Sequence, residues 1–277
     1  MIEVSVFARR FVTFCLAILG LVWLVPVLLM LTVAFTPPES RATGFGGLLP
    51  EQVSMRNFAI VFSDAPILRH LFNSLAIAGT SVVFVGLFGA MAGYAFARMK
   101  IPGKNIWFFL LITTLMLPVP TLIVPIFQIN KSLGLLDSYM GLILPYTAFG
   151  LPFAIIVLRS FFEALPKELE EAAKLDGVSQ PRIFWFIALP LSWPALTVVV
   201  IFQFMTSFNE FILALVTMDT DARKPLSLIP LIYSGQFFTQ PGAMFATLTL
   251  MTLPVIVVYV AMQRFMVGGL TAGAVKG

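Results

Sequence analysis

Residues 165–190 read LPKELEEAAKLDGVSQPRIFWFIALP and form the one long charged stretch in a chain dominated by apolar residues. Three acidic side chains, Glu168, Glu170 and Glu171, stand where the first turns of a helix would be, and negative charge there stabilises the positive end of the helix dipole. The stretch predicts a short helix that projects from the apolar segments. One face of it, apolar with small residues in its middle, is suited to close docking: Leu165, Leu169, Ala172, Ala173 and Asp176.

The second half of the stretch predicts a bend and a new helix. Gly177 can adopt the left-handed conformation that ends a helix. Ser179 then suits the N-cap and Pro181 the first turn of a following helix, which we expect from about Arg182 onward.

Several motifs carry a resemblance to a known family. Glu171-Ala172-Ala173, then Gly177, then Ile187-Ala188-Leu189-Pro190 resemble the cytoplasmic EAA loop of bacterial ABC importer permeases. The stretches GYAFAR at 93–98, FNEF at 208–211 and GGLTAGAVKG at 268–277 resemble MalG-like permeases of carbohydrate importers. The resemblance therefore covers most of the chain.

The resemblance implies an all-α membrane protein with the type I ABC importer permease fold, and a coupling loop over 163–190 that docks on an ATP-hydrolysing subunit. The alternative is an exposed loop whose carboxylates are merely solvated. The residues expected to couple to the ATPase subunit are Leu169, Glu171, Ala172, Ala173, Asp176 and Gly177.

Composition also indicates an integral membrane protein. Hydrophobic residues make up 59% of the 277 residues and charged residues only 11%, against about a quarter in soluble domains. We expect a single permease domain over 1–277 with about six membrane spans and a short interfacial helix near 55–62. The expected spans are 11–35, 71–97, 106–129, 139–161, 194–216 and 243–265.

The basic residues predict the orientation of the chain. With the amino terminus inside, 11 of the 17 Lys and Arg residues lie in the cytoplasm, which favours cytoplasmic termini in a bacterial inner membrane. Basic residues gathered at segment ends set topology, so nucleic acid is not an expected partner. The inside set is Arg9, Arg10, Arg98, Lys100, Lys104, Arg159, Lys167, Lys174, Arg182, Arg264 and Lys276; the outside set is Arg41, Arg56, Arg69, Lys131, Arg223 and Lys224.

Polar residues inside the expected spans are candidates for the solute path. Asn209 and Glu210 are the strongest, because an ionisable group at this depth usually faces protein or water. A structural hydrogen bond to another helix is an equal alternative. The full candidate set is Asn209, Glu210, Gln203, Tyr146 and Gln128, with Thr206 as a weaker member.

The absence of certain motifs limits the nucleotide and metal chemistry that this chain can perform. The sequence has no GxxxxGK[ST] phosphate loop, and its single Cys15 and single His70 exclude a Cys or His metal cluster. We therefore expect no enzyme and no cofactor of its own, with ATP and magnesium bound by partner subunits. The resemblance implies two ATPase subunits, a second, MalF-like permease subunit and an extracytoplasmic solute-binding protein, besides membrane lipid.

Two other functions stay open from the residues alone. An ion-coupled secondary carrier would need intramembrane carboxylates, of which only Glu210 is suitable. A membrane-embedded enzyme would need a catalytic constellation, and HExxH and GxSxG are both absent.

Overall fold

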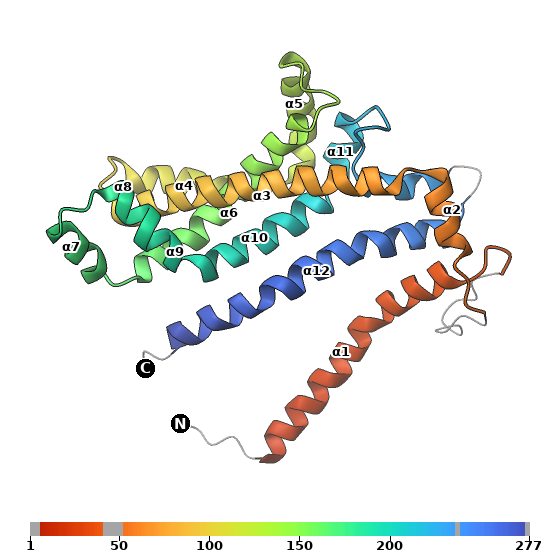
Figure 1. Ribbon diagram of the computed structural model, residues 1–277, viewed down its shortest axis with the longest axis horizontal. Coiled ribbons are helices and arrows are strands. Elements are labelled where there is room, and N and C mark those ends of the chain that lie inside the picture. The colour runs from red at the N-terminus through yellow and green to blue at the C-terminus, as the bar shows by residue number, and fades with distance from the viewer. Residues whose placement is uncertain (1–5, 41–51, 236–238, 275–277) are drawn as a thin grey trace. The chain divides into compact units, whose positions relative to one another are not determined.

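The computed structural model describes residues 6–40, 52–235 and 239–274, which form helices joined by short loops (Figure 1). Four helices are long and apolar enough to cross a membrane, and two bent helix pairs bring the total to as many as six. Residues 275–277 of the predicted glycine-rich tail lie outside the described residues.

Contacts divide the chain into two compact units, the first made of Met1–Ile67 and Ile229–Leu253 and the second of Leu68–Leu228 and Pro254–Gly277. The first unit holds α1 (Val6–Phe35) and α2 (Arg56–Asp64), which confirms the short helix expected near 55–62. Buried Asn57 joins them, because its Nδ2 donates to the carbonyls of Ala34 (2.9 Å) and Thr36 (2.7 Å). These bonds satisfy carbonyl groups that the end of α1 leaves without helical partners.

The second unit contains most of the remaining helices, and α6 is at its centre because α4, α10 and α11 all contact it. The last helix, α12 (Pro241–Ala274), continues from the first unit into the second. The elements of this part of the chain are α3 (Ile67–Arg98), α4 (Lys104–Thr114), α5 (Val119–Ser132), α6 (Met140–Ala164), α7 (Glu168–Leu175), α8 (Gln180–Ile183), a π-helix (Phe184–Ala188), α9 (Leu189–Leu191), α10 (Trp193–Phe208), α11 (Ile212–Thr217) and a 3-10 helix (Leu226–Tyr233).

Two glycines one turn apart let α3 approach α6 closely. A Cβ at Gly89 would lie 2.7 Å from the Cβ of Ala154, and one at Gly93 would lie 3.0 Å from the Cβ of Leu158. Small residues at this spacing are common where membrane helices pack backbone to backbone. The packing therefore fixes α3 against α6.

Two expected spans are broken helices in the structure, and both are proline-rich. The sequence predicts kinks from Pro118, Pro120 and Pro125 in the third span and from Pro190 and Pro194 at the start of the fifth. The segment at 106–129 is divided into α4 and α5, which meet at 99°. Pro118 stands at this break and has no N–H to continue the helix of α4. The segment at 194–216 is divided after Phe208, and Ser192 marks a further bend of 74° before α10.

Candidate functional site

The coupling segment has the helix, bend and second helix that its sequence predicts. α7 ends at Leu175, and Gly177 follows with a left-handed φ of 76°. Ser179 occupies the N-cap of α8 in an extended conformation, although its side chain makes no capping hydrogen bond, and Pro181 lies in the first turn.

The exposed face of α7 differs from the docking face that the sequence predicts, because one predicted member is buried. Most predicted coupling residues are exposed, and Leu175 is exposed to 90%. Ala173 is buried and turns toward the protein, together with Glu170. The exposed members of the predicted set are Leu169, Glu171, Ala172, Asp176 and Gly177.

Two side chains at the end of α3 hold the coupling segment. Nε of Arg98 lies 2.9 Å from Oε1 of Glu170, a charge contact that lacks the alignment of a hydrogen bond. The other oxygen, Oε2, accepts a hydrogen bond from the Tyr94 hydroxyl (3.2 Å), which in turn accepts one from Nε2 of Gln180 (2.6 Å). Nη2 of Arg98 donates to the carbonyl of Leu165 (2.6 Å). We call these five residues the α3–α7 joint.

Sequence reasoning missed the joint, because it assigned Glu170 to the helix dipole of the coupling helix, and Arg98 to the topology signal and to the GYAFAR resemblance. A usable signal was present in GYAFAR, where Tyr94 and Arg98 are four residues apart and so share one face of a helix. Because Arg98 and Glu170 are both buried, removing either one would leave an isolated buried charge, which is costly.

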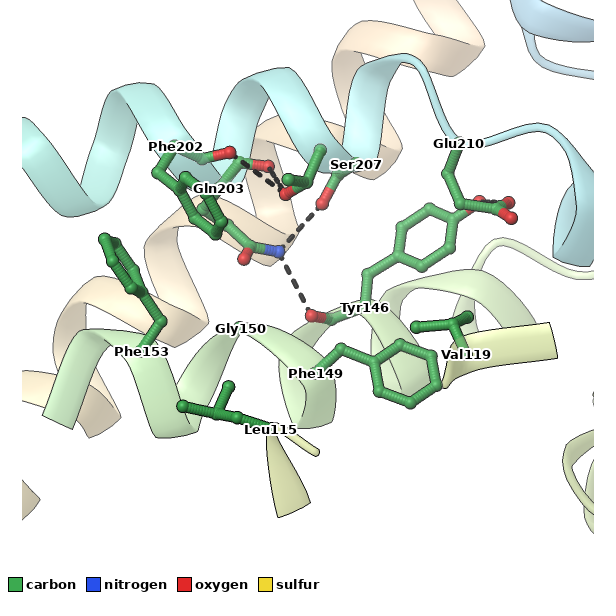
Figure 2. A pocket seen from close by; sticks show the side chains of 11 residues that line it. Leu115, Val119, Tyr146, Phe149, Gly150, Phe153, Phe202, Gln203, Ser207 and Glu210 are labelled. Atoms are coloured by element: carbon green, nitrogen blue, oxygen red, sulfur yellow. Dashed lines mark hydrogen bonds between the residues drawn. The ribbon is translucent and has the colours of Figure 1, made fainter. Parts of the chain in front are cut away.

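A second site is a cavity of ≈ 280 Å³ bounded by α6, α10 and the break between α4 and α5 (Figure 2). Aromatic rings and a few polar groups line it, the pattern expected of a small-molecule site. Its lining residues are Leu115, Val119, Tyr146, Phe149, Gly150, Phe153, Phe202, Gln203, Thr206, Ser207 and Glu210.

Glu210 lies in the break between α10 and α11, where its carboxylate has three donors. Oε1 accepts from the N–H of Leu213 (2.8 Å), and Oε2 accepts from the N–H of Ala214 (3.1 Å) and from the Tyr146 hydroxyl (2.7 Å). The carboxylate thus satisfies backbone donors at the start of α11 while one side of it borders the cavity.

Gln203 supports the opposite part of the cavity and is only 2% exposed. Its Nε2 donates to the carbonyl of Tyr146 (3.1 Å) and to Oγ of Ser207 (2.8 Å), as Figure 2 shows. A Cβ at Gly150 would lie 1.9 Å from its Oε1, so only glycine allows this approach of α6 to α10.

The structure brings together three of the predicted path residues, Tyr146, Gln203 and Glu210, and adds Thr206, the weaker candidate. Two predicted residues do not line the cavity: Asn209 is exposed and donates to the Met205 carbonyl of the adjoining helix α10, and Gln128 is exposed on α5. Ser207 and the rings Phe149, Phe153 and Phe202 were missed, since an aromatic residue in a membrane helix is more often packing than binding.

The lining of the cavity is suited to binding a small polar molecule. Its aromatic faces can stack on the C–H faces of a polar solute while the few polar groups orient it. In the described ranges, no group of three or more His, Cys, Asp or Glu residues is placed to hold a metal ion.

Comparisons with known proteins agree with this architecture. The family described as "binding-protein-dependent transport system inner membrane component" matches residues 86–271. A trehalose transport system permease of Mycobacterium tuberculosis is 36% identical over 92% of this chain and 93% of its own. A diacetylchitobiose uptake system permease of Streptomyces coelicolor is 33% identical over 97% of this chain and 90% of its own.

A solved structure has the same fold. It is a bacterial ABC transporter involved in the import of the acidic polysaccharide alginate, and the match has a TM-score of 0.78 at 23% identity. It covers 95% of this chain and 99% of the other.

Proposed function

The chain belongs to the family of binding-protein-dependent transport system inner membrane components, the permeases of ABC importers, and we propose that it forms half of a translocation pathway for a carbohydrate or a related polar solute. It is a multi-pass inner membrane protein. In the proposal its termini are cytoplasmic and a second, MalF-like permease subunit forms the other half of the pathway.

The proposed energy source is a pair of ATPase subunits that bind ATP and magnesium, because the chain has no phosphate loop. The chain itself is then not an enzyme and needs no cofactor. A solute-binding protein delivers the solute from outside, and ATP binding and release drive the change between outward-facing and inward-facing states.

The observation that carries the proposal is the exposed face of α7, a helix that the α3–α7 joint holds in place from its other side. Its outer face presents the apolar Leu169 and Leu175 beside the small Ala172, and Glu171 adds a charge. Leu169 and Leu175 are exposed together with Ala172 between them, and adjoining apolar side chains of this kind favour a surface that another protein covers. We propose that the ATPase subunit binds this face of α7. Asp176 and Gly177 then set the end of the helix and the bend that follows it.

The proposed solute class rests on the cavity and on the relatives together. Two relatives carry trehalose and diacetylchitobiose in their names, and both sugars offer C–H faces and hydroxyl groups. The cavity offers matching aromatic rings and the polar groups of Gln203, Thr206 and Glu210. A stand-alone ion-coupled carrier fits less well, because the Glu210 carboxylate already accepts three hydrogen bonds.

Co-purification tests the docking role. Leu175→Asp and Glu171→Lys should insert normally but recover less ATPase subunit through a tag on this chain, because each places an unfavourable charge on the docking face. Leu133→Asp is the matched control, since Leu133 is also an exposed leucine but follows α5, far from α7 in the chain. Full recovery of the ATPase subunit by both docking variants would show that α7 is an ordinary loop helix.

A further inference from the structure

The joint between α3 and α7 has a counterpart at the opposite end of α3. Nδ2 of Asn73 donates to the carbonyls of Ala222 (3.0 Å) and Lys224 (2.9 Å), and Oγ of Ser74 accepts from the N–H of Leu226 (2.8 Å). Asn73 and Ser74 are both buried. One helix therefore holds the loop at 219–226 near its start and the coupling segment at its end.

The helix between these two attachments is continuous and contains no proline. Over 32 residues it is about 48 Å long at 1.5 Å per residue. Among the four long apolar helices of the described chain, the other three contain internal prolines, at Pro26 in α1, Pro145 and Pro152 in α6, and Pro254 in α12, whereas α3 contains none. Proline is the commonest cause of a kink, so α3 lacks the kink site that each of the other three helices has.

We propose that α3 is a strut that couples the loop at 219–226 to the docking helix α7, with Glu170 and Asn73 as positioning residues. This rests on the proposed function, in which α7 meets the ATPase subunit. α3 is long and apolar enough to cross a membrane, and in this proposal its two attachments lie on opposite sides of the membrane. A displacement of α7 by the ATPase then moves α3 as a body and shifts the loop at the far end.

The joint transmits motion because it holds α7 at several points rather than one. Arg98 contacts both Leu165, before α7, and Glu170, within it, while Tyr94 reaches Gln180 beyond the bend. The side chains of Arg98 and Glu170 are 6% and 9% exposed, so water does not compete for the pair. Coupling between distant sites needs such a continuous chain of packed groups.

The test measures whether ATP at one end changes the loop at the other. In a Cys15→Ala background, Ala222→Cys introduces a thiol at an exposed loop position whose carbonyl Asn73 holds. The complex is isolated through a tag on this chain, and the rate of maleimide labelling is compared with and without magnesium-ATP. We expect ATP to change the rate when the joint is intact.

The decisive variant is the double substitution Arg98→Gln with Glu170→Gln. It leaves no unpaired buried charge, so the complex should assemble, whereas either single substitution would strand a charge. The ATP-induced change in labelling rate should fall by at least about fivefold, the lower end of ordinary allosteric couplings. Asn73→Ala removes two of the hydrogen bonds that hold the loop to α3, while His70 and Ser74 still contact it, so the variant should weaken the response.

The control is Arg159→Gln with Glu163→Gln, which neutralises an ion pair of the same chemistry within one helix. It should keep the full response. An unchanged ATP response in the Arg98→Gln, Glu170→Gln complex, or no ATP response with the joint intact, overturns the strut. Failure of the ATPase subunit to co-purify with the unaltered chain would instead contradict the proposed function.

Discussion

At the scale of single residues, the structure distinguishes two neighbours that the sequence treats as a pair. The Glu210 carboxylate accepts three hydrogen bonds from two helices, whereas the Asn209 side chain is exposed and donates to the Met205 carbonyl of the adjoining helix α10. These adjacent polar residues therefore differ in structural role: Glu210 stabilises the break between α10 and α11, and Asn209 does not.

Glu210→Gln should destabilise the protein by about 1–3 kcal/mol, because a glutamine offers one acceptor oxygen where a carboxylate offers two. Recovery of folded protein in detergent should fall, and uptake per assembled complex should change because the group borders the cavity. Asn209→Ala is the matched control and should be nearly neutral. Equal loss in both variants would contradict the assigned roles.

The carboxyl of Asp137, in the loop before α6, should make the stability of the protein depend on pH. Burial raises the pKa of its carboxyl, but hydrogen bonds from Thr220 and Asp219 and the charge of Arg223 outweigh it, so the pKa is lowered from its ordinary value. A lowered pKa contributes stability at pH above the ordinary carboxyl range, and this contribution is lost as pH falls through the folded-state pKa.

The measurement compares thermal stability with that of Asp137→Asn, which keeps a residue tolerant of the left-handed φ of 53° found there. The difference in melting temperature should be largest near pH 7 and should shrink as the pH falls below the ordinary carboxyl range and through the lowered pKa of Asp137. A difference that stays constant over this range would rule out the charged form of Asp137 as its source.

At the scale of elements, the sequence predicts the existence of most helices but not their orientation. The charged run at 168–175 is sufficient to predict α7, and Gly177 to predict its end. The face of α7 that turns inward is the one that carries Glu170, which bonds to Tyr94, 76 residues away in the chain. A local sequence pattern therefore cannot predict the orientation of α7. Pro118 likewise predicts an interruption of the third span, while the bend of 99° depends on what α4 and α5 pack against.

The bend at Gly177 can be tested by itself. Gly177→Ala should cost about 1–2 kcal/mol through the left-handed φ of 76°, since no atom lies within 4 Å of the added methyl group. ATPase co-purification should weaken, because α7 then leaves its position relative to α8. Gly79→Ala in α3 also meets no atom within 4 Å and has an ordinary φ, so it should be tolerated. Equal behaviour of the two variants would contradict a role for the bend.

At the scale of the whole molecule, the distribution of basic residues predicts which ends are cytoplasmic, and cysteine labelling can check it. In the Cys15→Ala background, Ser179→Cys should label from the cytoplasm and Ser40→Cys from outside. Both positions are exposed, so access to reagent is not limiting. Labelling of both thiols from one side would overturn the six-span topology.

Composition was sufficient to predict a membrane protein, and the resemblance of the EAA-type stretch to a known family predicted an importer permease, because hydropathy and the motif are local properties of the chain. The cavity was only partly predictable: the polar members Tyr146, Gln203 and Glu210 could be chosen as intramembrane polar groups, but the rings that complete it could not. An aromatic side chain in a membrane helix is equally expected against lipid, and only the tertiary packing separates the two.

The central claim is that this chain transports only as part of an ATP-driven assembly. The most direct test is uptake of radiolabelled trehalose and diacetylchitobiose into proteoliposomes, together with ATP hydrolysis, for the chain alone and for the complex with its second permease, ATPase subunits and solute-binding protein. We predict no uptake and no ATP turnover by the chain alone, and ATP-dependent uptake by the complex. Solute uptake or ATP hydrolysis that persists when every other subunit has been removed would contradict the account.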